Sequence, residues 1–426
     1  MGFDFKLKIS NASQLVVISK GKPFLIGKEM SNIEIIENGT MIIDENGIIF
    51  DIGTFKEMEE KYKDKSFEKV LDCTGKSVLP GFVDGHTHPV FSGDRVHEFA
   101  MKLAGATYLD VHKAGGGIQF TISHTKNSTE DELYQLLIPR LNRMLKNGTT
   151  LIEAKSGYGL ETETEMKMLK VLDRASKQFQ GVEIVSTYLG GHAIPKGMNA
   201  SEATDDIINK QIPELKRLKD AGEISPANID VFLEKGFFEY EDTKRILQAG
   251  KDIGLECNFH GDELSYMKSG ELAGELGCRA ISHLEKVSED GMKAMAATPT
   301  FAVLLPTTAY ILRLECPPAR RMIELGVPVA LGSDFNPNAH CLSMPFVMNL
   351  ACVLMKMNMN ESLVAATLNA AASINKSSTH GSLEVGKFAD FVILSADKWE
   401  HIIYEMVDPP ISHVFKKGNL VFSNNN

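Results

Sequence analysis

Eight short apolar segments alternate with helical patterns through the middle of this chain, and this alternation restricts the fold more than any other feature. The strand candidates are SVLPGFVDGH, TTLIEAK, EIVSTYL, NIDVFLE, LECNFH, RAISHL, FAVLLP and PVALGSD. Helical patterns separate them from the second strand onward, and one of these opens on a capping box formed by Thr129 and Glu132. Eight strands with intervening helices over about 300 residues predict an α/β fold, a (β/α)8 TIM-like barrel.

The two ends of the chain differ from the middle, because they contain short β-rich segments. QLVVIS and MIIDENGIIFDIG lie near the start, and EVGKFADFVIL and SHVFKKGNLVFS lie near the end of the 426 residues. We expect both ends to form one small composite β-sandwich domain. The predicted organisation is residues 1–75 and 379–426 for this β domain and residues 76–378 for the barrel.

Composition excludes several classes of partner. The formal net charge is −11, without a Lys/Arg cluster to offset it, so binding to nucleic acid is not expected. The six cysteines lack any CxxC pair, which fits a reducing, cytoplasmic location. An uncharged run over residues 294–312 contains Pro299 and Pro306, and the N-terminus lacks a signal-peptide pattern, so we expect no membrane association. The oligomeric state is left open, with a homodimer as one option.

The first predicted barrel strand ends in His86-Thr87-His88. Residues two apart on a strand project from the same face, with Cα atoms roughly 7 Å apart, so both imidazoles can reach one metal ion. Two ordinary buried histidines would give the same pattern, and the pair decides nothing alone.

Further ligand-type side chains end other predicted strands. His260 and Glu263 follow the fifth, His283 follows the sixth and Asp334 follows the eighth. Barrel enzymes place their chemistry at the carboxyl ends of the strands. Convergence of all these groups on one face favours a metal site over unrelated buried polar residues.

The expected ligands are His86, His88, His260 and Asp334. Nitrogen and oxygen donors without thiolate favour one divalent metal per chain, Zn²⁺ or Fe²⁺, and leave room for a water molecule whose pKa the cation lowers. We expect Glu263 to move protons beside that water and His283 to protonate a leaving nitrogen or hold the attacked carbonyl. Glu263, His283 and Asp334 are the predicted catalytic residues.

These residues in this order resemble the one-metal branch of the amidohydrolase superfamily. The stretches GDRVHEFAMKLAGATY, AGGGIQFT, KSGYGLETETEMKML, GGHAIPKG, NFHGDEL and GSDFNPN resemble the imidazolonepropionase family over essentially the whole chain. The resemblance implies hydrolysis, with water, of the cyclic amide of 4-imidazolone-5-propanoate to N-formimidoyl-L-glutamate, a step of histidine degradation.

The resemblance also implies substrate contacts from loops beyond the strand ends, namely Arg95, Tyr108, Tyr158, His192, Glu263 and Asn336. The planar fork of Arg95 can take a carboxylate bidentately. The tyrosine hydroxyls and His192 can hydrogen-bond substrate oxygens or the ring. Without the resemblance, a surface ion pair for Arg95 and core packing for the others would be the more ordinary interpretations.

Other interpretations remain open at this point. A related deaminase of a nitrogen heterocycle would share the metal site but would not need Arg95. A metal-free scaffold protein is expected only where the metal ligands have been lost.

Lys235 follows the fourth strand, where two-metal relatives carry a carbamylated lysine, but we expect it to be structural here. Asn338 and Ala339 stand where many bacterial imidazolonepropionases have a glycine and a small hydroxyl residue, and what replaces that hydroxyl is left open.

Overall fold

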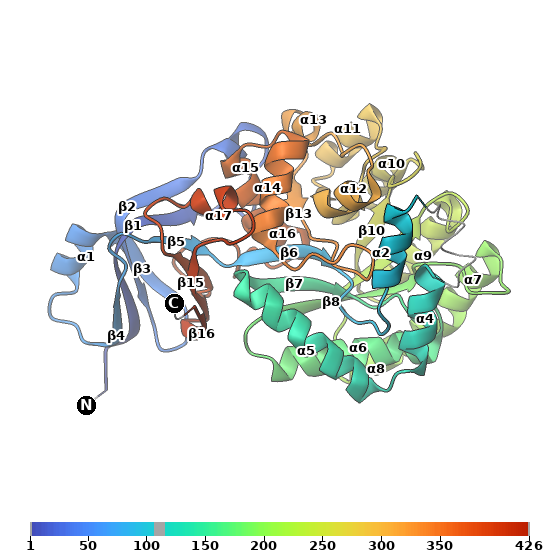
Figure 1. Cartoon of the computed structure of the whole chain (residues 1–426), viewed down its shortest axis with the longest axis horizontal. Helices are drawn as coiled ribbons and strands as arrows, with labels where there is room; N and C mark the ends of the chain where they lie inside the picture. The colour runs from blue at the N-terminus through green and yellow to red at the C-terminus, as the bar shows by residue number, and fades with distance from the viewer. Residues whose placement is uncertain (1, 106–115, 425–426) are drawn as a thin grey trace.

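The structure is a computed structural model that describes residues 2–105 and 116–424. Within these residues, eight parallel strands form a sheet in which each strand pairs with the next along the chain. Beyond the last strand, Thr87 and Phe335 form a bridge, and His88 N–H donates to the Phe335 carbonyl at 2.8 Å. The sheet therefore closes into the predicted barrel (Figure 1). Its strands are β6 (Phe82–Thr87), β7 (Thr149–Lys155), β8 (Glu183–Gly191), β9 (Asn228–Leu233), β10 (Glu256–Gly261), β11 (Ala280–His283), β12 (Phe301–Leu304) and β13 (Val329–Leu331).

Helices surround the barrel strands, and several of them bury one apolar face. In α5 (Glu130–Lys146) the predicted capping box is present, and Leu133, Leu137 and Leu141 are buried at helical spacing. The other helices are α2 (Val96–Leu103), α4 (Ile118–Asn127), α6 (Thr162–Gln178), α7 (Ala200–Asp206), the π-helix η2 (Ile207–Gln211), α8 (Ile212–Asp220), α9 (Tyr240–Asp252), α10 (Ser269–Leu276), α11 (Glu289–Ala297), α12 (Pro306–Leu312), α13 (Ala319–Glu324), α14 (Met344–Met355), α15 (Met359–Ala365) and α16 (Leu368–Ser373).

A mixed sheet built from both ends of the chain lies beside the barrel, and both termini lie on this side of the molecule (Figure 1). β5 pairs with β1 and also with β14, which joins the two ends into one sheet. One hydrophobic cluster takes side chains from both ends, including Leu7 and Phe391. This confirms the composite β domain. Its elements are β1 (Phe5–Ile18), β2 (Glu34–Ile43), β3 (Ile49–Thr54), β4 (Phe67–Asp72), β5 (Ser77–Pro80), β14 (Phe391–Leu394), β15 (Ile411–Lys416), β16 (Asn419–Ser423), η1 (Gly27–Ser31), α1 (Phe55–Lys61) and α17 (His401–Tyr404).

The segment SVLPGFVDGH differs from its prediction as one barrel strand. It forms β5 of the mixed sheet and β6 of the barrel, separated at Gly81. A Cβ at Gly81 would lie 2.3 Å from Thr150 Oγ1, so the chain passes too close to β7 for a larger residue. The barrel strands therefore begin at Phe82, a few residues after the predicted boundary at residue 76.

Among the described residues, helices long and apolar enough to cross a membrane are absent.

Candidate active site

The carboxyl ends of the barrel strands bring the predicted metal ligands together. His86 and His88 project from the end of β6, and His260 projects from β10. Asp334 follows β13, and its N–H donates to the His86 carbonyl at 3.0 Å, which fixes it beside the first strand. Asp334 has a left-handed backbone with φ of +47°, an unfavourable conformation that is typical of functional sites. All four side chains are buried.

The donor atoms have the spacing of a metal coordination sphere. His88 Nε2 lies 3.2 Å from His86 Nε2 and 3.3 Å from His260 Nε2. Asp334 Oδ1 lies 3.5 Å from the Nε2 atoms of both His86 and His88. Metal–nitrogen bonds of about 2.1 Å in tetrahedral geometry place the ligand atoms roughly 3.4 Å apart, so these positions fit one ion.

Two properties of these atoms also favour a cation. Asp334 Oδ1 is buried without a hydrogen-bond donor among the described residues, so it is available as a ligand. Burial lowers the pKa of His86, His88 and His260 well below the ordinary value, and nearby cationic groups lower it further. The imidazoles are therefore neutral, which is the form that binds a metal. His86, His88 and His260 form a group that can hold a metal ion.

Hydrogen bonds from β11, β9 and α12 hold these side chains with their donor atoms facing the centre. His86 Nδ1 lies 2.7 Å from Ser282 Oγ, and His260 Nδ1 lies 2.9 Å from Asp230 Oδ1. Thr308 Oγ1 donates to Asp334 Oδ2, which leaves Oδ1 to the metal. Such outer partners fix ring orientation and tautomer.

A buried lysine supports one of these partners. Lys155 Nζ lies 2.8 Å from Asp230 Oδ2 and 2.8 Å from Glu153 Oε1, inside the barrel. Burial lowers the pKa of Lys155, but the two carboxylates outweigh this and raise it, so the lysine stays charged. Burial raises the pKa of Asp230, and the charge of Lys155 opposes this shift, so the lysine favours the carboxylate form that can orient His260.

The sequence did not single out Asp230, Lys155, Ser282 or Thr308. Asp230 lies within the strand NIDVFL, and Lys155 ends the strand TTLIEAK. A charged residue in a buried strand is the signal that could have marked both. The sequence gives no comparable signal for Ser282 and Thr308, because a small hydroxyl residue is ordinary in a strand or helix.

Glu263 and His283 face each other at the edge of the centre. Glu263 Oε2 lies 3.8 Å from His283 Nε2. Burial raises the pKa of Glu263 to about 7, against the opposing effect of His283. Burial lowers the pKa of His283, but Glu263 and then Glu285 outweigh it and raise it to about 10. A carboxyl group that titrates near neutral pH is suited to general acid–base catalysis.

His192 and Tyr158 lie against the ligand His88. The rings of His192 and His88 are stacked, 4.9 Å apart at 16°, and Tyr158 lies 5.3 Å from His192. His192 Nδ1 lies 2.9 Å from the Gly157 carbonyl, so this nitrogen carries the proton and Nε2 is left as an acceptor. Burial raises the pKa of Tyr158, whose hydroxyl therefore remains a donor.

Arg95 lies after β6, and its side chain is largely buried. Its Nε and Nη2 atoms donate to Glu98 Oε2 at 2.9 and 2.7 Å, and Gly117 N–H donates to Glu98 Oε1 at 2.8 Å. The charge of Arg95 lowers the pKa of the Tyr158 hydroxyl, against the larger effect of burial. Tyr108 lies outside the described residues.

The remaining predicted residues have local partners. Asn336 donates from Nδ2 to the Asp334 carbonyl at 2.8 Å, and its Oδ1 accepts from the N–H groups of Asn338 and Ala339 at 2.7 and 3.0 Å. The amide of Asn336 thus braces the loop after β13, and its contact with substrate stays a prediction. Lys235 is exposed.

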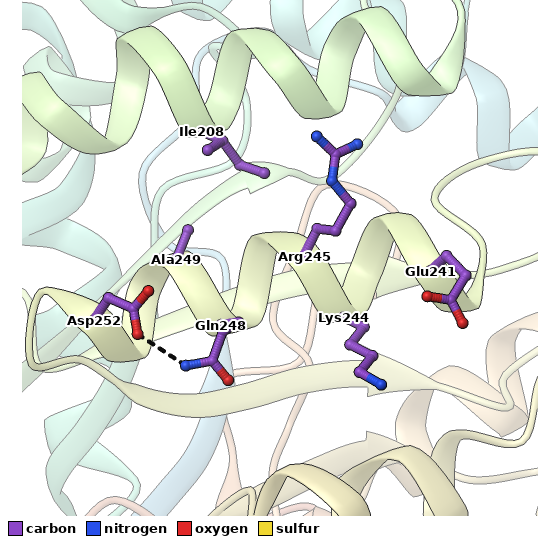
Figure 2. A pocket seen from close by; sticks show the side chains of 7 residues that line it. All are labelled: Ile208, Glu241, Lys244, Arg245, Gln248, Ala249 and Asp252. Atoms are coloured by element: carbon purple, nitrogen blue, oxygen red, sulfur yellow. Dashed lines mark hydrogen bonds between the residues drawn. The ribbon is translucent and has the colours of Figure 1, made fainter.

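A surface pocket of about 410 Å³ lies between η2 and α9, and it shares no residue with the metal centre (Figure 2). Two of its cations are already paired, Lys244 with Glu275 at 2.5 Å and Arg245 with Asp205 at 2.6 Å. We therefore place the chemistry at the barrel mouth and not in this pocket. The pocket is lined by Ile208, Glu241, Lys244, Arg245, Gln248, Ala249 and Asp252.

Comparison with known proteins identifies the family of this chain. The amidohydrolase family matches residues 77–421. A probable imidazolonepropionase from Nematostella vectensis is 58% identical over 98% of this chain and 99% of its own length. Another from Homo sapiens is 52% identical over 99% of this chain and 100% of its own. A solved adenosine deaminase from Xanthomonas campestris with bound zinc shares the fold, with a TM-score of 0.71 at 16% identity over 98% of this chain and 92% of its own. The chain therefore belongs to the imidazolonepropionase family within the amidohydrolases.

Proposed function

We propose that this protein hydrolyses the cyclic amide of 4-imidazolone-5-propanoate to N-formimidoyl-L-glutamate, a step of histidine degradation. Relatives named as imidazolonepropionases match it over nearly its full length. The observation that carries the proposal is the buried centre of three Nε2 atoms and Asp334 Oδ1, with Glu263 and His283 facing each other beside it. The substrate is a small molecule, water is the co-substrate, and the proposed compartment is the cytoplasm.

We propose one divalent metal per chain, Zn²⁺ or Fe²⁺, held by His86, His88, His260 and Asp334. Four protein donors at this spacing fill a single sphere with room for one exchangeable position. A cation bound there supplies Lewis acidity to a water molecule and to the attacked carbonyl.

The proton movements fall to Glu263 and His283 in this proposal. Glu263 takes a proton from the attacking water, because its carboxyl group titrates near pH 7 and can both accept and release a proton. His283 faces Glu263 through Nε2 and donates a proton to the leaving ring nitrogen as the amide C–N bond breaks. The water oxygen ends on the carbonyl carbon, and the proton held by Glu263 passes to His283, which restores both residues.

Substrate recognition is assigned to the residues around the centre. Arg95 takes the propionate, with Glu98 fixing the plane of its guanidinium. His192 Nε2 accepts from a ring N–H, and the Tyr158 hydroxyl donates to a substrate oxygen. Tyr108 and Asn336 complete the predicted contacts.

The direct test is hydrolysis of freshly prepared imidazolone propionate by the purified protein. The loss of ring absorbance measures the rate, and the product is then identified. N-formimidoyl-L-glutamate without ammonia supports the proposal. Ammonia release, with a deaminated ring as product, would favour the related deaminase activity instead.

A further inference from the structure

Glu285 is a buried carboxylate to which the reaction described above gives no role. Its side chain is 0% exposed, and both carboxylate oxygens lack a hydrogen-bond donor among the described residues. A carboxylate is costly to bury without donors, so a chain retains it where it serves another group. The group that it faces is His283, whose Nδ1 lies 3.7 Å from Glu285 Oε1.

His283 thus lies between two buried carboxylates. Its Nε2 lies 3.8 Å from Glu263 Oε2 on one side, and its Nδ1 lies 3.7 Å from Glu285 Oε1 on the other. Both separations exceed hydrogen-bond length but keep each ring nitrogen within ion-pair distance of a carboxylate oxygen. A half-turn of the ring about χ2 would break both pairings, so the two carboxylates together select one ring orientation.

The backbone brings Glu285 to this position through an unusual turn. His283 and Leu284 have φ of +78° and +69°, a left-handed conformation that is unfavourable for two successive residues with side chains. The turn is held by Leu284 N–H donating to the Gly261 carbonyl at 3.0 Å and by Lys286 N–H donating to the Asp262 carbonyl at 2.7 Å. The segment that carries Glu285 is therefore anchored to the segment that leads into Glu263.

We propose that Glu285 is a positioning residue for His283: it holds the imidazole so that Nε2 faces Glu263 and the reacting end of the substrate. This inference rests on the proposed hydrolysis of imidazolone propionate. Glu285 acts through His283 and does not touch the substrate, so its effect should appear in turnover and disappear when His283 is replaced.

The test combines Glu285→Gln with His283→Asn in a double-mutant cycle on the metal-loaded enzyme. We expect Glu285→Gln alone to lower kcat about 10- to 100-fold, as is usual for residues that orient active-site groups, with KM and metal content changed less than about twofold. In the His283→Asn background, the same substitution should change kcat by less than about twofold. Glu285→Asp, assayed in the same way, replaces Glu285→Gln if the latter does not fold.

Glu361→Gln is the matched control. Glu361 is equally buried, but it caps α15 and pairs with Arg320 outside the site. This variant should lower the melting temperature and leave kcat within about twofold of the wild type.

Three results would overturn the inference: an unchanged kcat in the Glu285 variant, an equal loss in both backgrounds, or a loss expressed mainly in KM. The last would place Glu285 on the substrate. Failure of the wild type and of Glu361→Gln to hydrolyse imidazolone propionate would refute the proposed function itself, which is a separate outcome.

Discussion

A substitution at Glu263 should lower the rate of the chemical step without weakening the binding of metal or substrate. Because burial raises its pKa to about 7, we expect Glu263→Gln to lose most turnover while metal content and substrate affinity are retained. General acid–base groups typically contribute about 10² to 10⁴ in rate, and a loss in this range is predicted. Single-turnover kinetics, metal analysis and equilibrium substrate binding measure the three quantities independently.

The double variant with His283→Asn tests whether the two residues work as one unit. Their facing atoms lie 3.8 Å apart, so the combined loss should be smaller than the product of the single losses. Near-wild-type turnover in Glu263→Gln would show that this carboxyl group only orients the loop after β10.

Arg95 should act on binding and not on the chemical step. A propionate clamp remote from the attacked carbonyl contributes mainly uniform binding, so Arg95→Met should raise KM about 10- to 100-fold and lower kcat much less. Steady-state kinetics decide the question. A pure turnover defect would argue that Arg95 takes part in the reaction, and an unchanged KM would leave it as a simple ion pair with Glu98.

At this scale, the sequence could predict which histidines come together but not the groups that support them. His86, His88 and His260 lie close together in the structure, and their positions at strand ends follow from the barrel topology. Asp230 depends on how neighbouring strands are staggered around the barrel, and strand order does not fix this stagger. The same holds for Glu285, whose position depends on a left-handed turn that sequence patterns do not indicate for Leu284.

At the scale of elements, a cluster of charges joins barrel strand β8 to the mixed sheet. Glu183 begins β8, and His380 Nε2 lies 3.2 Å and Lys416 Nζ lies 3.5 Å from its Oε2. Lys416 also lies 2.5 Å from Asp390 Oδ2. Burial raises the pKa of Glu183, but the hydrogen bond with His380 and the charge of Lys416 outweigh it and hold the pKa well below its ordinary value.

A carboxyl group whose pKa is lowered on folding stabilises the protein above its unfolded pKa, and this contribution is lost as the pH falls. We therefore expect Glu183→Gln to lower the free energy of unfolding by about 1–3 kcal/mol at neutral pH. The difference from wild type should be constant above about pH 5 and shrink below about pH 4. Urea unfolding at several pH values measures it, and a difference that grows on acidification would contradict the assigned sign.

Element types followed well from periodicity, while one boundary did not. The cap of α5 and the presence of eight barrel strands are as predicted, because capping residues and apolar runs are local signals. The sequence of residues 77–86 predicts a single strand because both halves of the segment are apolar, as in a buried strand. Its division at Gly81 follows from the close approach of Thr150, a contact between segments far apart in sequence.

At the scale of the whole molecule, we propose two domains, one of residues 1–75 with 379–426 and one of residues 76–378. Strand β5 (Ser77–Pro80), at the start of the second range, pairs within the mixed sheet of the first domain. Because the proposed ligands come from β6, β10 and the loop after β13, a cation bound there would join distant segments. Metal removal should therefore lower the melting temperature, and Zn²⁺ or Fe²⁺ should restore it, since a ligand that binds the folded state alone stabilises it. Scanning calorimetry with and without chelator checks this, and an unchanged melting temperature would contradict it.

The measurement that tests the central claim most directly is hydrolysis of imidazolone propionate by protein of known metal content. We predict conversion to N-formimidoyl-L-glutamate in proportion to bound Zn²⁺ or Fe²⁺, saturating at about one equivalent per chain, with loss of activity in chelator and recovery on adding metal back. Full activity in a metal-free preparation, a requirement for two equivalents, or absence of hydrolysis by the loaded protein would contradict the account.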